Sequence, residues 1–273
     1  MLGAICGDIL GSTYEIESRE EVSLLNKDDH FTDDTILTCA IAEWCLSYSH
    51  CDLEDEEHMY LLAHLFRDYS MKYKNAHYGC IYADWVMRFY AYGKIPDASN
   101  SYGNGCAMRV TPIAYAFDTL EKVEHYAKVS AKVTHNNSEG IRGACAIAAA
   151  TKMALDGNSK TQIKKYIEER YFYDLSKSLD DIKMKENEFS ATCQITVPQA
   201  IIAFFEGNDY EDTIVKAIGI GGDSDTVAAM AGGIAYAYWK KIPKHIIEHC
   251  LNTLSSEMKR LVEDFSEKYI KYT

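Results

Sequence analysis

The chain has 273 residues, of which 47% are hydrophobic and 25% charged, as in ordinary globular proteins. Its formal net charge of −13 argues against a nucleic-acid surface and against a polybasic membrane contact. No stretch reaches the roughly 18 uncharged apolar residues that a membrane span needs. The nine cysteines are scattered without a CxxC pair, and the first residues do not read as a signal peptide, so we expect a cytoplasmic protein with reduced thiols.

Helical patterns follow one another along the chain. The first clear pattern, residues 33–49, places Ile36, Leu37 and Ile41 on one face at helical spacing. The strongest pattern, 223–239, repeats apolar residues over three turns. The expected helices are 33–49, 53–74, 80–92, one that follows a turn at 101–105 and runs through Ala116, then 119–133, 138–155, 160–170, 197–206, 209–219, 223–239, 243–252 and 255–270.

Residues 171–195 are the least regular part, and we expect a loop or a short subdomain near the functional site there. Only four prolines occur and alanine is frequent in runs, and both facts favour helices. The sequence contains no alternating apolar pattern long enough for a sheet. We therefore predict an all-α fold, a single compact orthogonal multi-helix domain over residues 1–273.

Two acidic clusters stand at the starts of predicted helices, 223 − 34 = 189 residues apart. One interpretation is helix capping, since Asp, Ser and Thr are favoured there. Capping needs only one such residue, however, and crowded carboxylates repel one another unless a cation offsets their charge. Magnesium prefers such oxygen ligands, and two ions together can activate a water. The clusters are Thr32-Asp33-Asp34-Thr35 and Asp223-Ser224-Asp225-Thr226.

Glycines recur at positions 3, 7 and 11, so a helix there would present a smooth strip that lets another helix approach closely. We interpret this strip as packing. Glu15 follows the strip and would project into a site there, although alone it would be an ordinary surface glutamate.

A glycine-rich turn, Tyr102-Gly103-Asn104-Gly105, precedes a predicted helix. Its backbone N–H groups and the helix N-terminus would suit a phosphate, while the alternative is a turn and cap without a ligand. His135 lies between two helices. A lone histidine is more often structural, but His135 would donate to a ligand if the site lies beside it.

Taken together, these motifs resemble those of the ADP-ribosylglycohydrolase family. Each motif alone is weak, whereas five of them in the family's order across most of the chain are specific. The resemblance implies an all-helical fold with a dinuclear magnesium centre in a cleft, with Mn²⁺ as an alternative metal. The matching stretches are GDILGSTYE (7–15), FTDDT (31–35), YGNGCAMR (102–109), TH with a following EG (134–140) and GGDSDT (221–226).

The resemblance also implies roles for individual residues, by their place in these motifs. The implied metal ligands are Thr32, Asp33, Asp34, Asp223, Asp225 and Thr226. The implied catalytic residues are Glu15, Asp33 and Asp34. The implied contacts to ADP-ribose are Gly103, Asn104, Gly105, His135 and Ser224.

The activity that the resemblance implies is magnesium-dependent hydrolysis of the glycosidic bond between ADP-ribose and an acceptor. We expect the acceptor to be an ADP-ribosylated protein side chain such as arginine. Two alternatives stay open. The substrate could be a small ADP-ribosylated molecule or base, or the protein could bind ADP-ribose without cleaving it.

Overall fold

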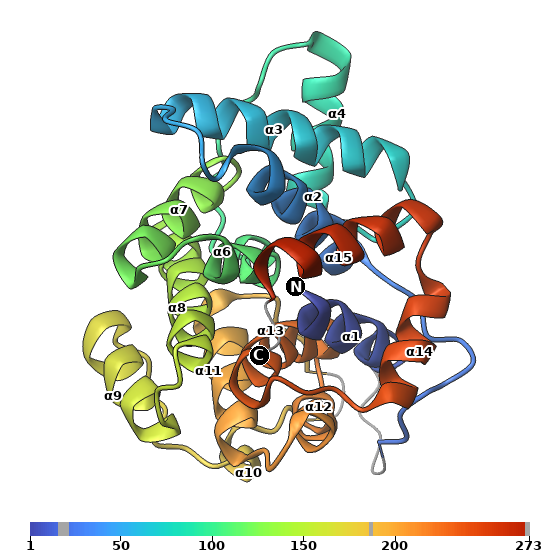
Figure 1. Ribbon diagram of the computed structural model, residues 1–273, viewed down its shortest axis with the longest axis vertical. Helices are drawn as coiled ribbons and strands as arrows, with labels where there is room; N and C mark the ends of the chain where they lie inside the picture. The colour runs from blue at the N-terminus through green and yellow to red at the C-terminus, as the bar shows by residue number, and fades with distance from the viewer. Residues whose placement is uncertain (16–21, 186–187, 271–273) are drawn as a thin grey trace.

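The computed structural model describes residues 1–15, 22–185 and 188–270. Within these ranges the chain forms helices and two isolated bridges but no strand, which confirms the all-α class (Figure 1). None of the described helices is both long and apolar enough to cross a membrane. The elements are α1 (Leu2–Gly11), η1 (Ser12–Tyr14), α2 (Asp33–Tyr48), α3 (Asp55–Lys72), α4 (Cys80–Tyr92), α5 (Gly105–Met108), α6 (Thr111–Ala116), α7 (Leu120–Lys132), α8 (Ser138–Leu155), α9 (Lys160–Tyr171), α10 (Leu179–Ile182), α11 (Cys193–Glu206), α12 (Tyr210–Gly219), α13 (Ser224–Trp239), α14 (Lys244–Thr253) and α15 (Ser256–Tyr269).

The centre of the molecule is the pair α1 and α13, which come from opposite ends of the chain (Figure 1). Their backbones nearly touch along the glycine strip, because a Cβ at Gly7 would lie 2.1 Å from the Ala228 carbonyl oxygen. Gly3 faces Gly232 while Gly11 faces Asp225, so the helices run antiparallel. The predicted packing role of the strip is confirmed. This packing places the end of α1 beside the start of α13.

Further helices enclose this central pair. α8, α11 and α12 pack against α13, and α2 packs against α1. The alanine-rich α8 is buried along most of its length, and its small side chains let α7, α11 and α13 approach it. One hydrophobic core runs from Met1 to Phe265, so the helices form a single packed body.

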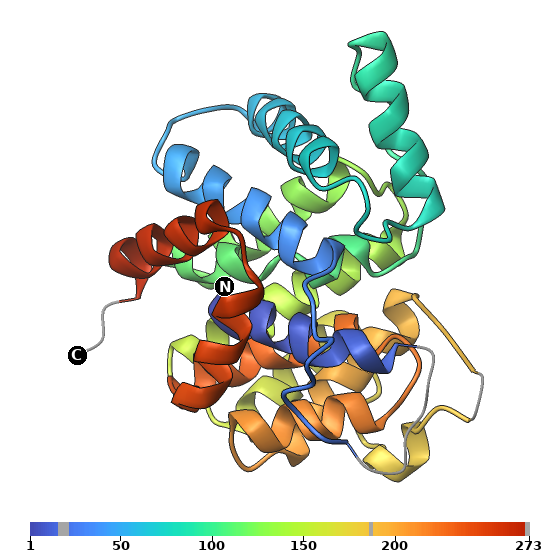
Figure 2. The same ribbon diagram turned by 90° about the vertical axis from the view of Figure 1, so that its right-hand side faces the viewer.

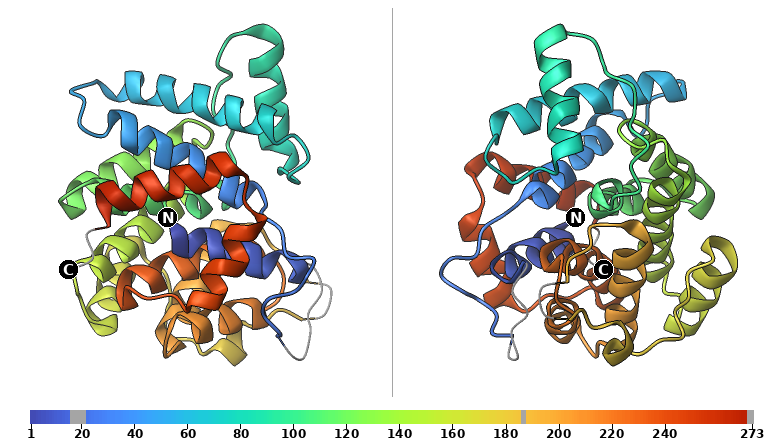
Figure 3. Two further views of the ribbon diagram at one scale, coloured as in Figure 1. Left: turned by 45° about the vertical axis from the view of Figure 1, so that its right-hand side comes forward. Right: turned by 180° about the vertical axis from the view of Figure 1, so that it is seen from behind.

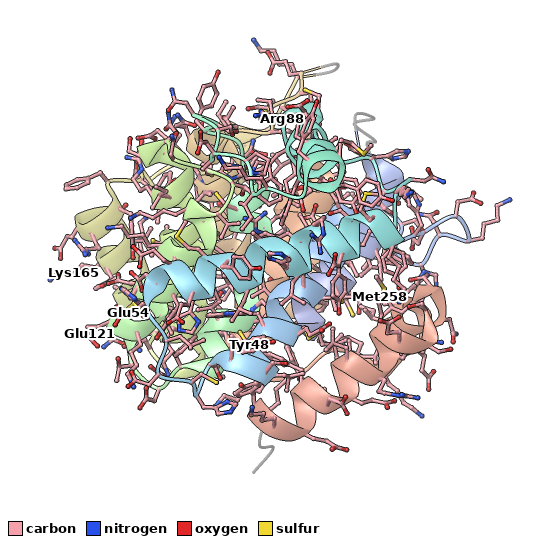
Figure 4. The ribbon with its side chains drawn as sticks, turned by 90° about the horizontal axis from the view of Figure 1, so that it is seen from above. Tyr48, Glu54, Arg88, Glu121, Lys165 and Met258 are labelled. Carbon is pink, nitrogen blue, oxygen red and sulfur yellow. The ribbon has the colours of Figure 1, made fainter. Side chains whose placement is uncertain are left out.

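The outer helices lie around this body. α4 projects from it (Figure 2), and α4 and α9 stay at the periphery in both views of Figure 3. Figure 4 looks down on α3 and shows Arg88 on α4 and Met258 on α15. The end of α3 meets the start of α15, where the Tyr73 and Ser255 hydroxyls lie 2.9 Å apart. The inner side of α4 buries Trp85 and Phe89.

The structure departs most from the predicted boundaries in three places. The helix expected through Ala116 is two short helices, α5 and α6, because Pro112 in the first turn of α6 cannot continue a preceding helix. α11 begins four residues before the expected 197 and contains Pro198 within it. The irregular segment 171–195 includes the short helix α10. Its end, near Ala191, does lie at the cavity described below.

Candidate active site

The first acidic cluster forms the opening turn of α2. Thr32 is the N-cap residue, and its side-chain oxygen accepts a hydrogen bond from Asp34 N at 3.3 Å. The carboxylate of Asp8, on α1, accepts from Thr32 N at 3.0 Å and from Thr35 N at 3.1 Å. Thr32 and Asp8 therefore cap this helix. Asp33 and Asp34 are not needed as caps, which leaves their carboxylates for another role.

The second acidic cluster begins α13. Gly221 and Gly222 have φ values of 82° and 77°, which glycine adopts without strain, and their turn leads directly into Asp223. The Asp223 side chain makes no capping bond and instead accepts from Asn104 Nδ2 at 2.6 Å. Asp225 Oδ1 accepts from Thr226 N at 2.8 Å. Asp223 thus does not cap this helix, whereas Asp225 satisfies one free amide of its first turn.

The α1–α13 contact brings the two clusters together. Oxygens of Asp8, Asp34 and Asp225 lie within 4.8 Å of one another, as do oxygens of Glu15, Asp223 and Asp225. Asp225 belongs to both groups. Thr226 Oγ1 also donates to Asp34 Oδ2 at 3.1 Å, which links the two helix starts. Glu15 follows η1 at the end of the glycine strip, where the sequence had predicted that it would reach a site.

Burial and the repulsion between its carboxylates make the ionised form of this cluster unfavourable in free energy when no cation is bound. Burial, and then the charges of neighbouring carboxylates, hold the pKa values of Asp33, Asp34 and Asp225 well above their usual range. Burial likewise raises the pKa of Asp223 to about 6. Among the described residues, no lysine or arginine forms an ion pair with these four carboxylates. In addition, Asp34 Oδ1 is buried without a hydrogen-bond partner. An oxygen-rich, unpaired anionic set of this kind fits a divalent cation.

The stability that Mg²⁺ adds should depend on pH. The raised pKa of Asp223, about 6 against 3.8, means that the folded metal-free protein keeps a proton that the unfolded chain loses in this interval. Stability of the metal-free protein should therefore fall as the pH rises through that interval. Since a cation binds the deprotonated carboxylates, Mg²⁺ should raise Tm more at about pH 7.5 than at about pH 5. Thermal unfolding with Mg²⁺ and with EDTA measures this, and an equal gain at both pH values would contradict it.

A cavity of about 330 Å³ opens beside the carboxylates. Its wall brings together most of the residues that the sequence proposed for the site, and it also includes apolar side chains, namely Trp85 and Ile81 of α4 and Leu37 of α2. The proposed residues on the wall are Glu15, Thr32, Asp33, Gly103, Asn104, Gly105, His135, Asp223, Asp225 and Thr226.

Two proposed residues do not line this cavity. Asp34 lies behind Asp33 with its carboxylate facing Thr226. Ser224 is fully buried, and its hydroxyl donates to the Gly11 carbonyl oxygen at 3.1 Å. This bond joins α13 to α1. A contact from Ser224 to a ligand stays a prediction.

The glycine loop is tied to the acidic cluster and to the segment before α11. Gly103 N donates to Ser101 Oγ at 3.1 Å and Asn104 N to the Ala191 carbonyl at 2.9 Å, so these two amides already have partners. The Asn104 side chain also reaches Thr196 Oγ1, at 3.2 Å, besides Asp223. Asn104 therefore holds a carboxylate of the cluster in place, in addition to facing the cavity.

His135 is held by a short chain of polar groups. Its Nδ1 lies 2.8 Å from Thr134 Oγ1, and Thr134 Oγ1 accepts from Arg109 Nη2 at 2.8 Å. Because Arg109 can only donate, the Thr134 hydroxyl is free to donate its proton to Nδ1. Arg109 is fully buried and stacks 4.0 Å from the Phe66 ring. His135 thus has a fixed orientation at the cavity wall.

Sequence reasoning assigned no role to Asp8 or Arg109. Asp8 stands in an otherwise apolar helix between Gly7 and Gly11, and a charge at such a position is a signal of a buried partner. Arg109 closes the YGNGCAMR stretch, and nothing in the local pattern distinguishes it from a surface arginine.

The fold is all-helical, and it brings buried carboxylates from two helix starts together beside one cavity. These features define the class: a helical protein with an acidic site of the kind that binds metal ions. The model of the family described as ADP-ribosylglycohydrolase matches residues 1–272. The chain belongs to this family and is an enzyme of it, which confirms the resemblance seen in its motifs.

Individual relatives agree with this assignment. The chain is similar to "ADP-ribosylhydrolase ARH3" of Mus musculus, 26% identical over an alignment 333 positions long, gaps included, that covers 92% of this chain and 86% of the relative. An "Uncharacterized protein" of Archaeoglobus fulgidus is 33% identical over 158 residues, which cover 53% of this chain and 52% of that protein. A solved structure titled "ADP-ribosylglycohydrolase-related protein complex" has a TM-score of 0.72 and 23% identity, with 97% of this chain and 96% of that chain covered, and thus shares the fold.

Proposed function

We propose that this protein is a hydrolase that uses two Mg²⁺ ions to cleave the glycosidic bond between ADP-ribose and an acceptor. The observation that carries the proposal is the pair of carboxylate groups that share Asp225, with oxygens within 4.8 Å of one another in each group, beside a cavity whose wall includes Glu15, Asp223 and Asp225. We further propose that residues 1–273 form one such domain, which the family match over nearly the whole chain supports.

The residues around the cavity suit the parts of this reaction. The ions would be held by the six residues of the two helix starts, and when bound they supply Lewis-acid polarisation and a more acidic water. The residues that would hold them are Thr32, Asp33, Asp34, Asp223, Asp225 and Thr226. Mn²⁺ has the same preference for oxygen ligands and is an alternative occupant.

The protein's own side chains would move the proton. A carboxylate of Glu15 or Asp33, which line the cavity, accepts a proton from the attacking water as the water oxygen bonds to the anomeric carbon of ADP-ribose, and Asp34 would relay that proton. The bond from that carbon to the acceptor nitrogen or oxygen breaks, and the proton taken from the water passes to the acceptor as it leaves. The carboxylates that face the cavity also stabilise the positive charge that develops on the sugar. His135, Gly103, Asn104 and Gly105 would bind the remainder of ADP-ribose.

We propose an ADP-ribosylated protein side chain, with arginine first, as the acceptor. Glu15 and Asp33 at the cavity wall favour a cationic group such as a guanidinium near the scissile bond. The nine cysteines are all free, which supports a reducing compartment such as the cytoplasm.

The test is release of ADP-ribose from ADP-ribosylarginine and ADP-ribosylserine peptides, with Mg²⁺ and with EDTA. We expect release from the arginine peptide that EDTA stops. Release from the serine peptide alone would change the acceptor but keep the activity. Release in EDTA would contradict the metal requirement. ADP-ribose binding without release from either peptide would favour another acceptor, such as a small molecule or base, or a binding protein.

A further inference from the structure

Asp8 is a fully buried carboxylate next to the acidic cluster. One of its oxygens lies within 4.8 Å of oxygens of Asp34 and Asp225, yet Asp8 does not line the cavity. It could either hold an ion directly or hold another side chain that does. Its hydrogen bonds distinguish these two roles.

Asp8 accepts four hydrogen bonds from the first turn of α2. Besides the two backbone bonds described above, the Thr32 hydroxyl donates to Oδ1 at 2.7 Å and the Thr35 hydroxyl to Oδ2 at 2.5 Å. Each carboxylate oxygen offers about two lone-pair sites, so the three donors to Oδ2 use that oxygen fully, whereas Oδ1 has one donor and keeps one site. Asp8 is therefore placed to fix α2, with little capacity left for an ion.

The bond from Thr32 determines how its hydroxyl faces the cavity. A threonine hydroxyl has one proton and two lone pairs. The proton points to Asp8 Oδ1 at 2.7 Å, and Asp34 Oδ2, at 3.5 Å, is the weaker acceptor. One lone pair accepts from Asp34 N at 3.3 Å. The second lone pair is left for a ligand, and Thr32 lines the cavity.

We propose that Asp8 is a positioning residue for the metal centre, which takes the Thr32 proton so that an oxygen lone pair of Thr32 is presented to an ion. This role rests on the proposed function, because it takes Thr32 as a metal ligand. The addition to that function is Asp8, a buried charged residue on α1 that orients Thr32, a proposed metal ligand at the start of α2.

The test variant is Asp8→Asn, which keeps the size of the side chain and replaces one acceptor oxygen with an NH₂ donor. An amide N–H that faces Thr32 Oγ1 reverses the hydrogen bond and turns the hydroxyl proton toward the cavity. We expect the Mn²⁺ affinity of the metal-free protein to fall about 10- to 100-fold, as when an outer hydrogen-bond partner of a metal ligand is lost. The electron paramagnetic resonance signal of free Mn²⁺ measures this without any substrate.

Two further variants make the test specific. Thr35→Val removes a hydroxyl bond to the same carboxylate but leaves Thr32 in place, so Mn²⁺ affinity should be unchanged. Thr32→Val removes the ligand itself. If Asp8 acts through Thr32, adding Asp8→Asn to Thr32→Val causes no further loss.

Wild-type affinity in Asp8→Asn would overturn the proposal, and so would additive losses in the double variant, which would make Asp8 a direct ligand. Circular dichroism in EDTA checks that each variant folds. If Asp8→Asn does not fold, Thr32→Ser is the deciding variant, because serine keeps the hydroxyl that bonds to Asp8. Wild-type Mn²⁺ affinity in Thr32→Ser supports the proposal, and a loss of Mn²⁺ affinity overturns it. Absence of Mn²⁺ binding by the wild type would instead refute the metal centre of the proposed function, and this positioning role with it.

Discussion

Asp225→Asn is expected to lower ADP-ribose release by more than about 100-fold, beyond the usual effect of losing an outer hydrogen-bond partner of a metal site. Asp225 is the carboxylate common to both groups of three, so its loss would remove a ligand from each of the two proposed ions at once. The measurement is the rate of ADP-ribose release at saturating Mg²⁺, together with the Mg²⁺ concentration that gives half of the maximal rate.

The same change should not weaken the fold. Burial and the charges of Asp223 and Asp34 hold the pKa of Asp225 well above its usual range, so a charge there opposes folding when no cation is bound. In EDTA at neutral pH, Asp225→Asn should therefore unfold at the same temperature as the wild type or above it. Asp264→Asn, on the exposed side of α15, is the matched control and should change neither activity nor Tm. Full activity in Asp225→Asn would refute the metal assignment.

Gly7→Ala is expected to destabilise the protein by about 3 kcal/mol or more, at or above the upper end of the usual cost of overpacking a core. The new Cβ would lie 2.1 Å from the Ala228 carbonyl oxygen and 2.5 Å from its carbon. These are backbone atoms of α13, which cannot turn aside as a flexible side chain would. The two central helices would have to separate. Denaturant unfolding in EDTA measures the loss.

Gly219→Ala is the matched control, since a Cβ at this last position of α12 meets no atom within 4 Å. It should be neutral or slightly stabilising, because alanine favours helix over glycine by about 1 kcal/mol. Gly7→Ala should also weaken metal binding, since α1 carries Asp8 and α13 carries Asp225. Wild-type stability in Gly7→Ala would contradict the close contact between these helices.

The helices were predictable where local chemistry determines them. α13 starts within one residue of its predicted position, and α7 begins next to its predicted start at Thr119, whose side chain caps it by accepting from Lys122 N at 3.3 Å. The predicted helix boundaries were wrong near two prolines. Pro112 lies in the first turn of α6, whereas Pro198 lies inside α11. The difference depends on packing around the proline, which no local pattern contains.

The site was predictable as a set of residues but not as a geometry. The two acidic clusters were recognisable because each carries more carboxylates than capping requires. Their meeting depends on the α1–α13 contact, for which the glycine strip was the only local sign. Asp8 was missed because its partners lie 24 and 27 residues away. Asn104 was assigned to substrate alone because its bond to Asp223 spans 119 residues.

The antiparallel pairing of α1 with α13 has a consequence for how the protein reaches its native state. Tyr210 bonds to Gly3 across 207 residues and Ser224 bonds to Gly11 across 213, so the central contacts are among the most non-local in the chain. Such contacts require a large loop to close and tend to slow folding. During synthesis, α1 emerges early and its apolar surface stays uncovered until α13 has been made. Uptake of a metal ion would then report that α13 has reached its place, because a fragment that ends before α13 lacks Asp223 and Asp225.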